Sequence, residues 1–307
     1  MSVEPGSDDG SAHDSDDGRL SISETQDLCN ITYSREGTIA AFNGYFEFLT
    51  AMFMEPELVH QPPEGGWPEI TVDTMRTLGK TEEVAELLRR LPYTRFPSGQ
   101  EGKAGGAPGG GFTLTDWTKI ARNVSSEHGS CPESTMNLYR QPTEGVYEHV
   151  PSHVVGLVSA AHFEMFLDTQ LGVIYFPGWI YVPGPTAVAQ DTYGPFKPVA
   201  DDPHDYASTE EANDWRTGGM GLKCAWAIPE FFEMMKYHFR NLTYLLLTRV
   251  WVAEAFGEDE ENARGMPAAF PIVRQIFQKH GWPDLARYQK EKCMDELDSR
   301  WEELFDH

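Results

Sequence analysis

The chain has 307 residues, a formal net charge of −24, 40% hydrophobic residues and eight tryptophans. A chain of this length and apolar content can bury a full-sized core, so a disordered protein is excluded. Because so large a negative charge repels nucleic-acid phosphates and anionic lipid headgroups, we expect no nucleic-acid partner and no membrane partner; basic proteins and metal cations are compatible with it.

The first 27 residues are rich in serine, aspartate and glycine and contain few apolar residues. This composition predicts a disordered acidic tail over residues 1–27. The tail lacks the basic and apolar regions of a signal peptide. The four cysteines lie far apart, as expected of reduced thiols rather than a disulfide framework. We therefore expect a cytoplasmic protein, with a nuclear location left open.

A long amphipathic helix is predicted over residues 35–54. Its large apolar residues recur at intervals of three and four positions, which places them on one face. They are Ile39, Phe42, Phe46, Leu49 and Phe53. Ser34 is suited to cap the N-terminus, and Glu36 lies in the first turn, where a carboxylate is favoured by the helix dipole. The helix is expected to end before Glu55-Pro56.

Residues 61–68 are rich in proline and glycine, a composition that predicts a rigid surface loop. Trp67 lies within this loop. We favour the interpretation that its ring anchors the loop to the fold over one in which the ring faces a ligand. Thr71 and Thr81 then suit the N-caps of two short helices, the first of which is ended by Gly79.

Three runs of residues carry a recognisable pattern: Phe48-Leu49-Thr50, the loop from Pro62 to Thr71, and the segment from Leu78-Gly79-Lys80 to Leu91-Pro92-Tyr93. These runs resemble a group of uncharacterised filamentous-fungal proteins. The proline-glycine-tryptophan loop is the most specific of the three. The resemblance implies no particular activity, cofactor or site residue.

A β pattern begins near residue 152. The apolar, β-branched segment 153–160 is predicted as a strand, followed by strands over 163–168 and 173–176 and by a segment, 179–182, that could extend the sheet. The second and third form a hairpin, because Gly172 in the turn between them can adopt a positive φ. A strand ending in Asp168, then a turn, a glycine and a valine-isoleucine strand resembles the SMI1/KNR4 (SUKH) family of interaction domains. This resemblance implies a role in protein contacts.

Glycine, alanine and proline fill most of residues 98–111, without the spacing of a phosphate-binding loop, so we expect a flexible loop. Residues 229–256 are predicted as one buried helix, because apolar residues occupy nearly all its faces. The longest uncharged run in this helix is too short to cross a bilayer. Two more helices are predicted over 271–280 and 285–305.

The chain lacks a recognisable catalytic signature, such as a Gly-x-Ser-x-Gly elbow or a Ser-x-x-Lys set. Pro151 lies between His149 and His153, so one helix face does not carry both rings. His162 and Asp168 could approach each other if the hairpin folds back. Because scattered histidines usually have structural roles, we expect no catalytic residue, no metal site and no cofactor.

The predicted fold is α+β, predominantly helical with a small antiparallel sheet, in a single globular domain over residues 28–307. We expect a non-enzymatic protein-interaction module with an unknown protein partner. The alternative is a small-ligand-binding protein or enzyme, with a pocket between the loop of Trp67 and the sheet at 153–182. The side chains expected to contact a ligand or partner are Trp67, Tyr93, Asp168 and Trp179.

Overall fold

The computed structural model describes residues 20–96, 114–126, 138–140, 143–144, 150–158, 165–176, 194–199, 215, 224–249, 251–255 and 269–300. In these residues it confirms the predicted α+β class, with mostly helical structure and small antiparallel sheets. The predicted glycine-rich loop at 98–111 and the predicted strand at 179–182 lie outside the described residues.

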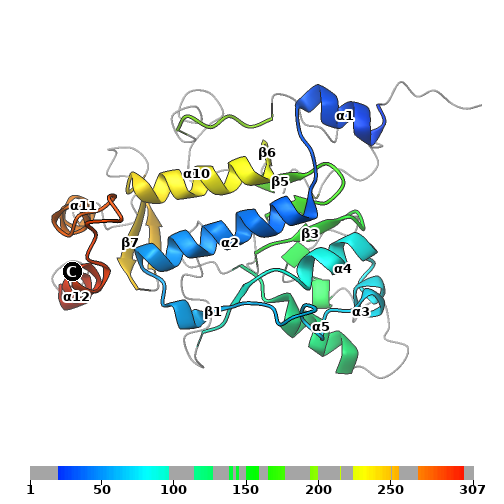
Figure 1. The fold of residues 1–307 in the computed structure, drawn as a ribbon, viewed down its shortest axis with the longest axis horizontal. Helices are drawn as coiled ribbons and strands as arrows, with labels where there is room; N and C mark the ends of the chain where they lie inside the picture. Colours follow the sequence, from blue (N-terminus) through cyan, green and yellow to red (C-terminus); the bar gives the residue numbers. More distant parts are fainter. Residues whose placement is uncertain are drawn as a thin grey trace, which may run out of the picture.

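The helices follow the chain from α1 to α12 (Figure 1). Their bounds are α1 (Ile22–Cys29), α2 (Arg35–Met52), the 3-10 helix η1 (Pro56–Leu58), α3 (Val72–Thr77), α4 (Glu82–Leu88), α5 (Trp117–Ser126), α10 (Ile228–Arg240), α11 (Ala269–Lys279) and α12 (Lys290–Ser299). None of these helices combines the length and the apolar character that crossing a membrane would need.

The strands pair only in antiparallel fashion among the described residues. Their bounds are β1 (Val59–His60), β2 (Tyr93–Thr94), β3 (Val154–Gly156), β4 (Phe166–Asp168), β5 (Val173–Phe176), β6 (Cys224–Ala227), β7 (Tyr244–Thr248) and β8 (Trp251–Glu254). The largest sheet has the order β3-β4-β5-β6, and β1-β2 and β7-β8 form two small sheets. The predicted hairpin is confirmed as β4-β5, with Gly172 at φ 75° in its turn.

Side-chain caps fix the helix starts where the sequence predicts them. The Ser34 hydroxyl accepts a hydrogen bond from the Gly37 N–H at 3.1 Å and begins α2. Thr71 and Thr81 cap α3 and α4 in the same way. Because a capping side chain satisfies an N–H group that has no partner within the helix, these predictions needed only local sequence and are confirmed.

The predicted disordered tail over residues 1–27 is wrong at its C-terminal end, because α1 begins at Ile22. Ser21 and Glu24 form a reciprocal capping box: the Glu24 N–H donates to the Ser21 hydroxyl and the Ser21 N–H donates to the Glu24 carboxylate. This box stabilises the first turn despite the polar composition. Residues 1–19 lie outside the described residues.

The single helix predicted over 229–256 is also wrong. Helix α10 ends at Arg240, and the chain then forms the β7-β8 hairpin. Leu242 has a φ of 53°, which an α-helix does not allow. Near its C-terminus the chain departs from the prediction again, since α12 begins at Lys290 rather than at 285; residues 301–307 lie outside the described residues.

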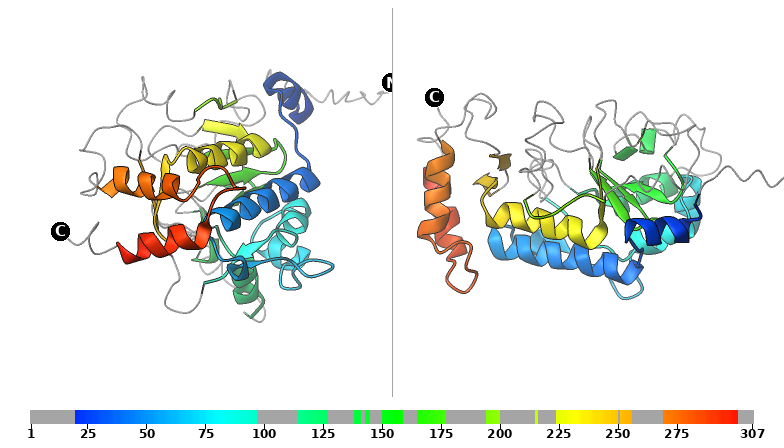
Figure 2. Two further views of the ribbon diagram at one scale, coloured as in Figure 1. Left: turned by 60° about the vertical axis from the view of Figure 1, so that its left-hand side comes forward. Right: turned by 90° about the horizontal axis from the view of Figure 1, so that it is seen from above.

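Helices α2 and α10 lie side by side at the centre of the molecule and run in the same direction (Figures 1 and 2). Aromatic pairs join them in order along both helices. The rings of Phe42 and Phe232 lie 4.7 Å apart between centroids, and those of Phe48 and Phe239 lie 6.3 Å apart. The four-stranded sheet lies toward one end of this pair, and α11 and α12 lie toward the other (Figure 2).

The C-terminal segment covers the end of α2. The Tyr288 hydroxyl donates to the Met52 carbonyl at 2.9 Å, and the Lys290 ammonium donates to the Met54 carbonyl at 2.8 Å. The last carbonyls of a helix have no partner within it and attract cations. These two contacts therefore fix the end of α2, from which the chain continues toward the loop of Trp67.

Candidate functional site

The loop of residues 61–71, here called the anchored loop, is held by its tryptophan. Trp67 is only 7% exposed, and its indole N–H donates to the Leu91 carbonyl at 2.8 Å. The Trp67 ring packs 5.8 Å from the Tyr93 ring between centroids, and the Tyr93 hydroxyl donates to the Leu88 carbonyl. These contacts agree with the interpretation that Trp67 anchors its own loop.

Two hydrogen bonds to Arg89, one through its main chain and one through its side chain, tie the same loop to the end of α4. The Trp67 N–H donates to the Arg89 carbonyl at 2.8 Å, and the Arg89 guanidinium donates to the Gly65 carbonyl at 2.7 Å. Gly66 has a φ of 85°, and a Cβ atom there would lie 2.7 Å from the Arg89 carbonyl oxygen. Only glycine permits this close approach. The loop is therefore fixed at both its backbone and its side chain.

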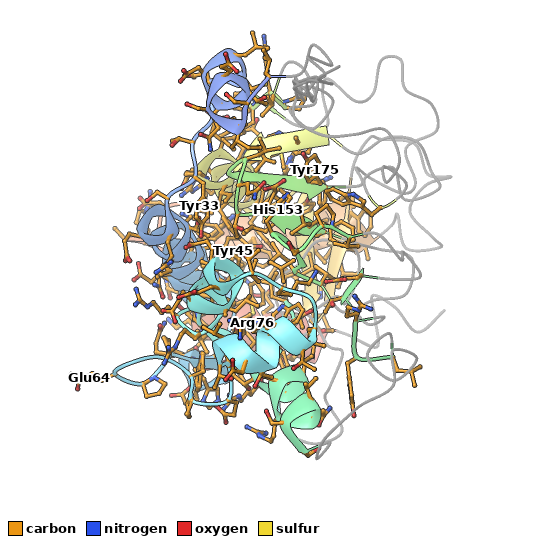
Figure 3. The ribbon with its side chains drawn as sticks, turned by 90° about the vertical axis from the view of Figure 1, so that its right-hand side faces the viewer. Tyr33, Tyr45, Glu64, Arg76, His153 and Tyr175 are labelled. Atoms are coloured by element: carbon orange, nitrogen blue, oxygen red, sulfur yellow. The ribbon has the colours of Figure 1, made fainter. Side chains whose placement is uncertain are left out.

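Beyond these anchors, the tip of the loop, residues Pro63 to Gly65, is exposed. Glu64 lies at the outer end of the loop and points away from the body of the molecule (Figure 3). A Cβ atom added at Gly65 would meet nothing within 4 Å. The tip therefore stands clear of the surrounding side chains while its base is packed into the core.

The charged groups near the base of the anchored loop pair with one another. Arg89 lies 3.0 Å from the Glu86 carboxylate, and Arg90 lies 3.5 Å from the same carboxylate and 3.4 Å from Glu36. The Arg122 guanidinium donates to Glu69 at 2.8 Å and thereby lowers the pKa of that carboxyl.

Glu64 differs from these residues. Within the part of the chain that the structure describes, Glu64 makes no ion pair. The tip therefore carries one negative charge that no side chain in the described part of the chain neutralises.

Asp168, another of the expected contact residues, is the last residue of β4, next to the turn of the β4-β5 hairpin, and is fully buried. One of its carboxylate oxygens accepts from the Gln170 and Leu171 N–H groups at 2.8 and 2.9 Å. The other lies 3.5 Å from Nε2 of His153. Asp168 thus stabilises the turn. His162, which the sequence analysis set opposite Asp168, lies outside the described residues.

The structure therefore brings together two of the four expected contact residues. Trp67 and Tyr93 pack against each other, whereas Asp168 lies at the end of β4 and Trp179 lies outside the described residues. The polar atoms of both paired rings already donate to main-chain carbonyls. The Trp67 indole, which can only donate, therefore has no hydrogen bond left for a ligand unless it releases the Leu91 carbonyl, whereas the Tyr93 hydroxyl can still accept one.

A buried ion pair was missed by the sequence analysis. The Lys80 ammonium lies 2.5 Å from the Glu144 carboxylate, and both side chains are nearly inaccessible to solvent. Burial lowers the pKa of Lys80 and raises that of Glu144, while the attraction between the two charges opposes both shifts. Nothing in the local sequence distinguishes either residue from an ordinary surface charge.

The lysine of this pair has a structural partner. Its ammonium also donates to the Val154 carbonyl at 2.8 Å, on the outer edge of β3. The indole N–H of Trp117 donates to Gly156 on the same strand, and the Thr115 N–H donates to Leu157 just beyond it. These donors occupy the edge where another strand would otherwise pair. The Lys80 ammonium is thus buried because it satisfies a main-chain carbonyl at the free edge of β3.

No group of three or more histidine, cysteine, aspartate or glutamate side chains that could hold a metal ion occurs in the described part of the chain. No protein-family model, curated protein or solved structure matches the chain. Its function must therefore be inferred from its own geometry. Among the features described above, the anchored loop alone combines a base held by buried hydrogen bonds with an exposed, charged tip, which is the arrangement of a contact loop on a rigid scaffold.

Proposed function

We propose that this chain is a non-enzymatic protein-interaction module of the cytoplasm and that the tip of the anchored loop contacts its protein partner. The observation that carries the proposal is the contrast between the buried Trp67 anchor and the exposed Glu64. A flexible loop loses conformational freedom on binding, which weakens affinity. A loop already held in one conformation avoids most of that loss.

Two features of the sequence support the same function. The likeness of the β4-β5 hairpin to SUKH interaction domains favours a role in protein contacts. The net charge of −24 favours attraction to basic proteins over attraction to nucleic acids or anionic lipid. We also propose that the chain is related to the filamentous-fungal proteins that the anchored loop resembles. This relationship implies no particular activity.

The test is quantitative affinity purification from the cells in which the protein is made. The test variant carries Pro63→Ala and Glu64→Ala in the tip. The chain offers a matched control, Pro229→Ala with Glu230→Ala, which removes the same exposed dipeptide from the start of α10. Thermal unfolding of both variants verifies that neither change disrupts the fold.

We expect the tip variant to lose specific co-purifying proteins that the wild-type chain and the α10 control retain. The proposal is contradicted if all three chains recover the same proteins in the same amounts. A reproducible turnover of a small molecule by the purified wild-type chain would also contradict it, and would favour the alternative of an enzyme or a ligand-binding protein.

A further inference from the structure

The chemistry of the tip restricts what its partner can be. Pro63 has no backbone N–H group, its carbonyl already accepts from the Gly66 N–H, and the Gly65 carbonyl accepts from Arg89. The strongest polar group that the tip presents is therefore the Glu64 carboxylate. An ionised carboxylate only accepts hydrogen bonds, so its complement is a cationic donor.

The surroundings of the tip strengthen this preference. The cations at the base of the loop are engaged by carboxylates: Arg89 and Arg90 by Glu86, Arg95 by Asp116, and Arg122 by Glu69. The field at Glu64 is thus not offset by a free positive charge among its described neighbours. At longer range, the net charge of −24 also attracts a positively charged surface.

We propose that the partner is a protein with a basic surface and that an arginine of this surface binds the Glu64 carboxylate. Arginine presents a planar fork of N–H donors that matches both oxygens of a carboxylate, which a lysine ammonium does not. The open space beside Gly65 lets a broad guanidinium or an aromatic neighbour approach the tip backbone. This inference rests on the proposed function of the anchored loop.

The experiment uses the full-length chain, immobilised, with nuclease-treated soluble extract of its own cells as the probe. Recovery of each bound protein is measured at several salt concentrations for the wild-type chain and for Glu64→Gln, Glu64→Asp and Glu64→Lys. Glu230→Gln on α10 is the matched control, because it removes one exposed carboxylate of the same type elsewhere. Nuclease treatment removes bridging by nucleic acids.

Glu64→Gln keeps the shape of the side chain and removes its charge. We expect it to reduce recovery of the tip-dependent proteins about tenfold, and Glu64→Lys to reduce it further, since charge-assisted hydrogen bonds are the stronger ones. Glu64→Asp is expected to retain part of the binding. The proteins that bind the wild-type chain through the tip should be basic. Added salt should weaken their binding to the wild-type chain more steeply than it weakens their residual binding to Glu64→Gln.

The outcomes separate this inference from the proposed function. If the double alanine variant of the tip loses its partners and Glu64→Gln keeps them, the proposed function holds, but the inference that the partner has a basic surface is wrong. The inference is also overturned if the tip-dependent proteins are acidic, or if their recovery does not change with salt concentration. If neither the double alanine variant nor Glu64→Gln loses a partner, the proposed function itself fails.

Discussion

At the scale of single residues, Lys80 shows what local sequence leaves out. It stands between the glycine that ends α3 and the threonine that caps α4, where a lysine is normally solvated. Its position is decided by Val154, which lies 74 residues further along the chain. The local pattern predicts the caps on either side but contains no information about this distant carbonyl. Its burial is therefore visible only in the folded chain.

Replacing Lys80 with methionine should destabilise the protein strongly. The change leaves the Glu144 carboxylate buried without its partner and the Val154 carbonyl without its donor. Removal of one member of a buried ion pair costs about 3–5 kcal/mol in free energy of unfolding. Denaturant unfolding measures this cost.

Two comparisons make that measurement specific. The double variant Lys80→Met with Glu144→Met should recover much of the loss, because no uncompensated charge remains. Lys279→Met breaks a solvent-exposed pair with Glu296 and should cost less than about 1 kcal/mol. If Lys80→Met costs no more than Lys279→Met, the ion pair does not hold the edge of the sheet.

His238 should make the protein sensitive to acid. Burial lowers the pKa of His238 to about 4, below its ordinary value of 6.5. Above pH 6.5 the ring is neutral in both the folded and the unfolded chain, so its contribution to stability is full. As the pH falls from 6.5 toward 4, only the unfolded chain gains the proton, and up to about 3 kcal/mol of stability is lost.

The measurement is the free energy of unfolding between pH 7 and pH 4. His238→Gln should show a smaller decrease over this range than the wild-type chain, whatever its absolute stability. His60→Gln removes a less buried histidine on β1 and serves as the control. Equal slopes for the wild-type chain and His238→Gln would disprove the assignment.

At the scale of elements, the predictions succeeded where the signal was local. The caps of α2, α3 and α4 and the glycine turn of the β4-β5 hairpin were all found from a few neighbouring residues. The single helix over 229–256 failed, because a continuous apolar run fits a buried strand as well as a buried helix. The run Tyr244–Thr248 became β7, packed against α11 and α12.

The two glycines of the anchored loop offer a test of how firmly it is held. Gly65 and Gly66 have nearly the same φ, 86° and 85°, so alanine is similarly strained at both. Only at Gly66 would the added Cβ also meet the Arg89 carbonyl oxygen, at 2.7 Å. Gly66→Ala should therefore cost about 1–3 kcal/mol more than Gly65→Ala.

Thermal or denaturant unfolding of the two variants gives this difference, and amide hydrogen exchange locates it. The Trp67 amide, which bonds to Arg89, should exchange faster in Gly66→Ala than in Gly65→Ala. Equal costs and equal exchange would mean that the close contact with α4 is not what fixes the loop.

At the scale of the whole molecule, the parallel pair of α2 and α10 supports both ends of the structure (Figure 1). The anchored loop, α4 and Tyr93 belong to the same buried core as this pair. The sequence could predict the loop and the anchoring role of Trp67 from composition. It could not predict that Glu64 makes no ion pair with the described residues, because the charges at the base of the loop are brought there from α2, α4 and α5 by the fold.

The most direct measurement of the central claim is native mass spectrometry of the chain purified untagged from its own cells, without overexpression. The account predicts that the wild-type chain retains a second protein and that the chain with Pro63→Ala and Glu64→Ala does not. A chain that instead retains a small molecule or a metal ion, with no protein bound, would contradict the account and favour a ligand-binding function.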